Sequence, residues 1–153
     1  MWAAATDWNS KDLGISLQWT VNPAEAAFEE VYGGPHDTAV AEAFFPNQQR
    51  PRKVLVYEKT FTPIGLARMR NSFQHELGHI MGLRHEHAST TVEPSLVILV
   101  GVENPLSIMG YKSERSILPT DVSWTKYFYT LANGTTLRSE QNVFSWLIHD
   151  YSP

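Results

Sequence analysis

The chain has 153 residues, of which 42% are hydrophobic and 18% charged, and its formal net charge is -4. This composition is that of one globular domain with a buried core, and it excludes an intrinsically disordered chain. The mild negative charge argues against nucleic-acid binding, which normally needs a basic excess. The chain has no cysteine, which excludes disulfides, thiolate metal sites and cysteine nucleophiles. No apolar run reaches the roughly 20 residues of a membrane span.

The first part of the chain is expected to form a short helix and several strands. Residues 2–8 predict the helix, which closes near Gly14. The strands are predicted from segments that alternate between apolar and polar residues, or are rich in apolar residues, and that end at turn residues. These segments are 15–21, the apolar stretch 38–45, most clearly 54–57, and more weakly 27–32.

A helix over residues 66–81 follows, because its apolar residues recur at helical spacing. The predicted apolar face consists of Leu66, Met69, Phe73, Leu77, Ile80 and Met81. Gly82 follows directly, as a residue that commonly ends a helix.

The second half of the chain is expected to be irregular. A strand is possible at 97–100, and Leu118 to Asp121 resembles a helix start, with Trp124, Phe128 and Leu131 spaced to face inward. A turn is predicted at Asn133–Gly134, which also matches a glycosylation acceptor pattern, and a last helix at 140–150. We therefore predict an α+β fold in which 1–153 is one domain, with a twisted mixed sheet and central helix in 1–82 and an irregular part in 83–153.

Residues 75–85 read His-Glu-Leu-Gly-His-Ile-Met-Gly-Leu-Arg-His. His75 and His79 are four residues apart, so on a helix both imidazoles lie on one face and can bind one metal ion. Gly82 can take a positive φ at little cost, so the chain can turn sharply and bring His85 to the same ion. Three histidines with a fourth position open is the arrangement of a catalytic zinc site, with one ion.

Glu76 follows the first histidine and can reach a water at the metal without being a ligand. We expect Glu76 to act as general base and then general acid in peptide-bond hydrolysis. The competing interpretation is an amphipathic helix that carries histidines by chance. Four of the six histidines fall between positions 75 and 87, which argues against chance. His87 is expected at the surface, since the ligand set is already complete, and so are His36 and the carboxylate of Glu42.

With this motif the chain resembles the metzincin zinc peptidases, whose signature also includes a methionine turn downstream. Ser107-Ile108-Met109-Gly110-Tyr111 matches that turn. The resemblance implies that Met109 forms an apolar floor under the histidines. It also implies that Tyr111 stabilises the oxyanion, after serving as a fifth metal ligand. Glu86, directly after the third histidine, resembles astacins in particular.

Another segment is similar to a different branch of that clan. Residues 41–46, Ala-Glu-Ala-Phe-Phe-Pro, resemble the edge strand of matrixins and related secreted microbial peptidases, which pairs with extended substrate. This implies substrate contacts from Ala41, Ala43 and Phe44, unless the segment is a plain strand end. Astacins normally carry disulfides, which this chain cannot form. The similarity covers about residues 15–131, and residues 134–153 carry no recognisable signature.

The sequence thus predicts a metalloendopeptidase that cleaves protein or peptide substrates and acts as a monomer. The resemblance implies secretion, although Met1 to Asp7 lacks the features of a signal peptide. Three alternatives stay open at this point: a zinc-binding interaction module of the same fold that has lost turnover, a zinc hydrolase of non-peptide amides, and a structural zinc protein.

Overall fold

In the computed structural model of the protein, the structure is described for residues 1–88, 98, 100–112, 115–138 and 145–149. The chain divides into two compact units, Met1–Leu83 and Arg84–Ser152. Within the described ranges the fold is a small α+β fold of three α-helices and small sheets, so the predicted class is confirmed.

The first unit contains a mixed sheet of three strands, β1 (Glu29–Gly34), β2 (Ala41–Glu42) and β3 (Lys53–Tyr57), in the order β1-β3-β2. Strand β3 is parallel to β1 and antiparallel to β2. Its branched side chains Val54 and Val56 are buried, which explains why this strand was the clearest in the sequence. The predicted strands at 27–32 and 54–57 are confirmed with slightly shifted bounds.

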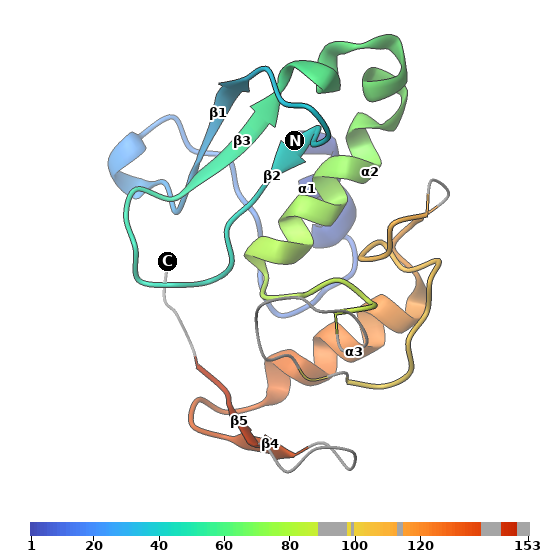
Figure 1. Ribbon diagram of the computed structural model, residues 1–153. Helices are drawn as coiled ribbons and strands as arrows, with labels where there is room; N and C mark the ends of the chain where they lie inside the picture. The colour runs from blue at the N-terminus through green and yellow to red at the C-terminus, as the bar shows by residue number, and fades with distance from the viewer. Residues whose placement is uncertain (89–97, 99, 113–114, 139–144, 150–153) are drawn as a thin grey trace. The chain divides into compact units, whose positions relative to one another are not determined.

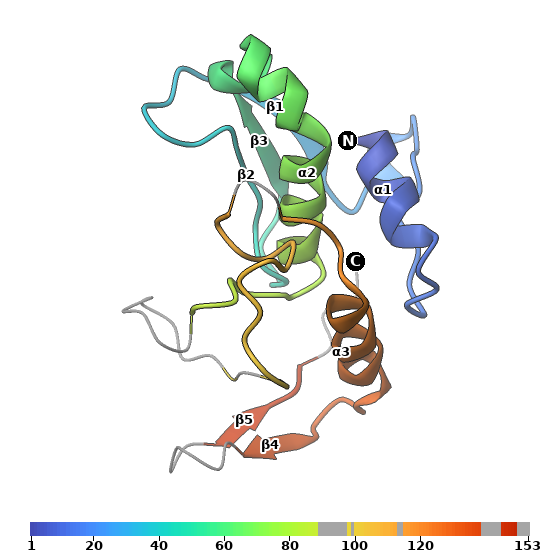
Figure 2. The same cartoon turned by 90° about the vertical axis from the view of Figure 1, so that its right-hand side faces the viewer.

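Two helices accompany this sheet, α1 (Trp2–Asn9) and α2 (Pro63–Ile80), with short 3-10 turns at Pro23–Glu25 and Glu58–Phe61. Helix α2 crosses one face of the sheet (Figure 1), and the turned view places α2 between the sheet and α1 (Figure 2). Thr62 caps α2 by accepting the N–H of Gly65 at 3.1 Å.

The C-terminal half of α2 carries the core of this unit. Phe73, Leu77 and Met81 are buried, as their spacing predicted. Trp8 of α1 is also buried and donates its indole N–H to the carbonyl of Gln74 at 2.9 Å. Leu66 was expected on the same face but is 54% exposed, so the apolar face is shorter than predicted.

The strand predicted at 15–21 is absent. The side chain of Asn9 donates to the carbonyl of Leu17 and accepts its N–H, both at 2.8 Å. Because a side-chain amide satisfies these two backbone groups, this stretch runs without a strand partner. Trp19 and Val21 are exposed, so the alternation does not mark a buried face.

The second unit contains α3 (Pro119–Thr130) and a hairpin of β4 (Thr136–Arg138) and β5 (Ser145–Leu147). The predicted helix start and the turn at Asn133–Gly134 are confirmed.

The last helix predicted at 140–150 is wrong for residues 145–147, which pair with β4 in a hairpin; residues 140–144 and 150 lie outside the described residues. The possible strand at 97–100 is described only at 98 and 100, and neither is in a strand.

The inward face of α3 also differs from the prediction. Trp124 is 41% exposed, whereas Asp121 and Thr125 are buried. The Asp121 carboxylate accepts the N–H groups of Leu118 at 2.7 Å and Ile108 at 3.3 Å. The buried face of the helix is therefore polar, because it satisfies backbone donors of the neighbouring loop.

Candidate metal centre

The end of α2 has the geometry that the third histidine requires. Gly82 has a φ of 91°, in the left-handed region. The N–H of Leu83 donates to the carbonyl of Gly78, and the N–H of Gly82 to that of His79, both at 2.9 Å. This pair of bonds is a Schellman motif, which ends the helix and turns the chain. The predicted role of Gly82 as a helix stop is confirmed.

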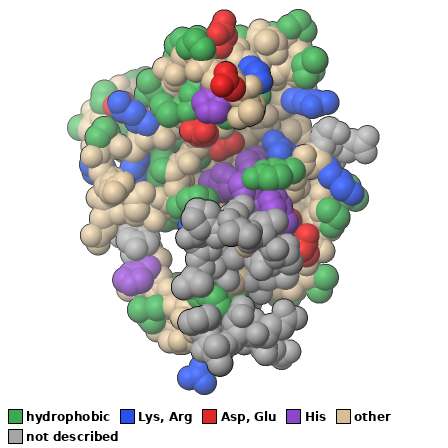
Figure 3. Space-filling model, in the orientation of Figure 1, with side chains coloured by type: hydrophobic (Ala, Val, Ile, Leu, Met, Phe, Trp, Pro, Cys, Tyr) green, Lys and Arg blue, Asp and Glu red, His purple; other side chains and the backbone are tan. Residues whose placement is uncertain are grey.

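His75, His79 and His85 lie close enough together to bind one metal ion. Each offers one ring nitrogen, and these three atoms lie within 4.8 Å of one another. His75 and His79 are buried, and their rings meet edge to face with centroids 4.6 Å apart. The space-filling view shows histidine side chains gathered on one face, with acidic side chains beside them (Figure 3).

Two of these histidine rings make a further contact through their Nδ1 atoms, and this contact restrains their orientation. The Nδ1 atom of His79 lies 2.8 Å from the carbonyl oxygen of Leu83, so it carries the proton and donates. A histidine that donates its Nδ1–H to a carbonyl presents Nε2 as its metal ligand. The Nδ1 of His85 lies 3.0 Å from the hydroxyl of Tyr111, and this contact restrains the orientation of the His85 ring. Three neutral nitrogen donors fit a zinc ion and also other transition metals.

Glu76 is buried beside these ligands. Its Oε2 accepts the backbone N–H of Ala43 at 2.8 Å, so the residue after strand β2 orients the carboxylate. Ala43 was expected to contact substrate, and this hydrogen bond to Glu76 was not foreseen. No sequence signal links the two residues, because they lie 33 positions apart and meet only through the sheet.

Glu86 connects the segment after His85 to the methionine turn within the second unit. Its backbone N–H donates to the carbonyl of Met109 at 3.2 Å, and its carboxylate accepts the N–H of Asn104 at 3.2 Å and a hydrogen bond from Ser107. Burial raises the pKa of the Glu86 carboxyl above its ordinary value, and these hydrogen bonds only partly oppose that shift.

The turn itself is compact. Met109 and Ile108 are buried, and Gly110 donates its N–H to the carbonyl of Ser107 at 2.9 Å. A Cβ at Gly110 would lie 2.7 Å from the carbonyl oxygen of Pro105, so only glycine fits there. The side chain of Met109 is buried, and its role as a floor under the histidines stays a prediction.

Tyr111 follows this turn and is 65% exposed. The ring contacts His85, with centroids 4.6 Å apart, and His87, at 4.4 Å. The rings of His85 and His87 are themselves stacked at 5.5 Å. His87 is half-buried in this aromatic group, although a surface position was expected.

The segment after β2 lies beside the histidines of α2. Phe45 meets the ring of His79 edge-on, with centroids 4.9 Å apart, and sequence reasoning did not single it out. Phe44 instead contacts Phe28, at 6.0 Å, and the guanidinium of Arg52, at 5.7 Å. Ala41 is buried within the sheet.

Comparisons with protein families, with curated proteins and with solved structures gave no match. In the part of the chain that the structure describes, no helix has the length and apolar character to cross a membrane.

Proposed function

We propose that the protein is a zinc-dependent endopeptidase of the metzincin type. The observation that carries this proposal is the approach of ligand atoms from His75, His79 and His85 to within 4.8 Å, next to the buried carboxylate of Glu76. A set of three histidines accompanied by a carboxylate that is not one of the clustered ligands is typical of catalytic zinc sites, and structural sites usually have four protein ligands.

His75, His79 and His85 would hold the ion. When bound, zinc supplies Lewis-acid polarisation of a carbonyl and lowers the pKa of water towards about 7. Glu76 would remove a proton from the attacking water and return it to the leaving amine. The N–H of Ala43 supports this role, since a charge-assisted hydrogen bond fixes the carboxylate in one orientation.

Tyr111 would hold the ring of His85 and stabilise the developing oxyanion through its hydroxyl. In the present geometry this hydroxyl lies 3.0 Å from Nδ1 of His85, so it contacts one of the proposed metal ligands. Contact with the oxyanion requires the side chain to turn, and its 65% exposure supports that freedom.

The sheet supports binding of an extended substrate. Strand β2 is at one end of the order β1-β3-β2, so it is an edge strand, to which a peptide can add. The N–H of Ala43 is already donated to Glu76, so a backbone contact from Ala43 to substrate would use its carbonyl oxygen.

The test is digestion of casein by the zinc-loaded protein, with and without a chelator, beside Glu76→Gln. We expect the chelator to abolish cleavage. We expect Glu76→Gln to lower kcat by about 10²- to 10⁴-fold while zinc content stays at that of the wild type. Cleavage that survives both changes would refute the assignment.

A further inference from the structure

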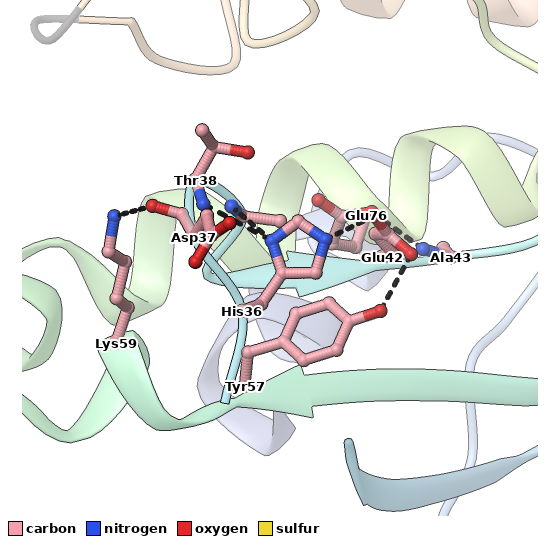
Figure 4. A network of polar contacts seen from close by, with 9 residues as sticks. His36, Asp37, Thr38, Glu42, Ala43, Tyr57, Lys59 and Glu76 are labelled. Atoms are coloured by element: carbon pink, nitrogen blue, oxygen red, sulfur yellow. Dashed lines mark hydrogen bonds and ion pairs between the residues drawn. The ribbon is translucent and has the colours of Figure 1, made fainter. Parts of the chain in front are cut away.

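Three side chains form a group on strands β2 and β3 and on the loop before them, which we call the His36 cluster: His36, Glu42 and Tyr57. The hydroxyl of Tyr57 donates to Oε2 of Glu42 at 2.7 Å. Nε2 of His36 lies 3.7 Å from Oε1 of the same carboxylate. The rings of His36 and Tyr57 contact each other, with centroids 4.5 Å apart. Figure 4 shows the carboxylate of Glu42 beside these two rings, near Nε2 of His36 and the hydroxyl of Tyr57.

The hydrogen bonds of His36 fix its tautomer. Its Nδ1 accepts the N–H of Thr38 at 3.2 Å and that of Ala39 at 2.9 Å. An acceptor nitrogen carries no proton, so the neutral ring has its proton on Nε2, directed towards Glu42. The loop that leads into β2 therefore places the Nε2–H of His36 3.7 Å from the Glu42 carboxylate.

Tyr57 remains a hydrogen-bond donor over the working range of a peptidase. The bond to Glu42 raises its pKa above the ordinary value of 10.0, and burial and the charges of Glu42 and Glu76 add to the shift. Tyr57 is buried, whereas the carboxylate that accepts its bond is 53% exposed, so the bond is part-buried. Glu42 is exposed on its strand, as the sequence predicted, but its bond to Tyr57 was not foreseen.

The cluster adjoins the contact that orients Glu76. Strand β2 has only two residues, Ala41 and Glu42, and they pair with Val56 and Leu55. Ala43 comes next, and its N–H donates to Glu76. A two-residue strand has few ladder hydrogen bonds to hold it in place. The hydrogen bond from Tyr57 to Glu42 therefore helps to fix the position of the residue directly before Ala43.

We propose that Glu42, held by the hydrogen bond from Tyr57, is a positioning residue for Glu76. It fixes the end of β2, and thereby the Ala43 N–H that orients the general base. This inference rests on the proposed peptidase function. Its structural part can be tested separately, because loss of the Tyr57–Glu42 bond should make the Ala43 backbone more mobile whether or not the protein cleaves peptides.

The first test measures kcat and KM on a fluorogenic peptide for Glu42→Ala, Tyr57→Phe and Glu42→Gln. Both Glu42→Ala and Tyr57→Phe remove the bond, and each should lower kcat by about 3- to 30-fold with KM nearly unchanged, since the reacting groups are misplaced and substrate contacts remain. Glu42→Gln keeps an oxygen acceptor for Tyr57 and should restore kcat to within about threefold of wild type. The matched control is Glu58→Gln, an exposed carboxylate next to Tyr57, which should leave kcat unchanged.

The second test is hydrogen exchange at the Ala43 amide, followed by NMR in the zinc-loaded protein. Exchange should be about tenfold faster in Glu42→Ala and Tyr57→Phe than in wild type or Glu42→Gln, because local opening exposes the N–H. Equal exchange rates in all four proteins, or wild-type kcat in both Glu42→Ala and Tyr57→Phe, would overturn the proposal. A wild-type protein that cleaves no peptide would refute the peptidase function alone, and the exchange rates would still decide the positioning role. Because Tyr57→Phe changes a buried residue, the exposed substitution Glu42→Ala protects the test against a folding defect.

Discussion

Nδ1 of His79 lies 2.8 Å from the carbonyl oxygen of Leu83, a residue beyond the end of the helix that carries this histidine. The same turn thus ends α2 and fixes which nitrogen of His79 faces a metal. Because Leu83 takes its place through the left-handed conformation of Gly82, the helix stop and the ligand orientation depend on one residue.

Gly82→Ala should therefore lower both stability and metal affinity. A Cβ at a φ of 91° costs about 1–2 kcal/mol, which a denaturant titration would detect. The control is Gly34→Ala, since Gly34 also has a positive φ, of 82°, with open space around it. Both variants should lose stability, but only Gly82→Ala should bind zinc more weakly. Equal zinc affinity in the two would show that the turn does not orient His79.

Tyr111→Phe removes the hydroxyl that lies 3.0 Å from Nδ1 of His85 and keeps the ring contacts. Loss of such a partner typically costs 10- to 100-fold in metal affinity or activity, so we expect a zinc dissociation constant about 10-fold higher or more. Competition with a chromophoric chelator measures this dissociation constant. An unchanged zinc dissociation constant together with a reduced kcat would limit Tyr111 to the oxyanion role.

The pairing of Asp7 with Arg70 predicts a specific loss of stability in acid. The Arg70 guanidinium is the main cause that lowers the pKa of Asp7 below 3.8, with Gln74 as a further donor and burial as an opposing effect. A carboxyl whose pKa is lower in the folded state stabilises the fold above its unfolded pKa, and this contribution is lost as the pH falls through the folded value.

The thermal midpoint of the wild type should therefore fall more steeply than that of Asp7→Asn once the pH drops below about 4. At pH 5 to 7 the wild type should be the more stable of the two. Calorimetry across this range is the measurement, with Glu30→Gln on β1 as a control for the loss of one exposed charge. Parallel curves for wild type and Asp7→Asn would contradict the assignment of this pair.

Much of the histidine cluster could be predicted because its determinants are local. The spacing of His75 and His79 fixes one helix face, and Gly82 supplies the turn that brings His85 to them. Strand β3 could be predicted for a similar reason, since its β-branched residues Val54 and Val56 share one buried side of the strand.

The predictions from sequence fail where a distant or polar group takes the place of the expected packing or pairing partner. Leu17 forms hydrogen bonds with the side chain of Asn9 instead of a strand, and periodicity carries no sign of that. Ser145–Leu147 pairs with β4, because a partner strand outweighs the helical spacing of Trp146 and its neighbours. The Ala43–Glu76 contact depends on how β2 lies beside α2, which no local pattern contains.

The most direct test of the peptidase assignment is the cleavage-site profile of the zinc-loaded protein on a proteome-derived peptide library, with Glu76→Gln as control. The account predicts cuts at internal peptide bonds that disappear in Glu76→Gln, while both proteins bind one equivalent of zinc at His75, His79 and His85. One equivalent of zinc with no cleavage by the wild type would contradict it, and would favour a zinc-binding interaction module instead.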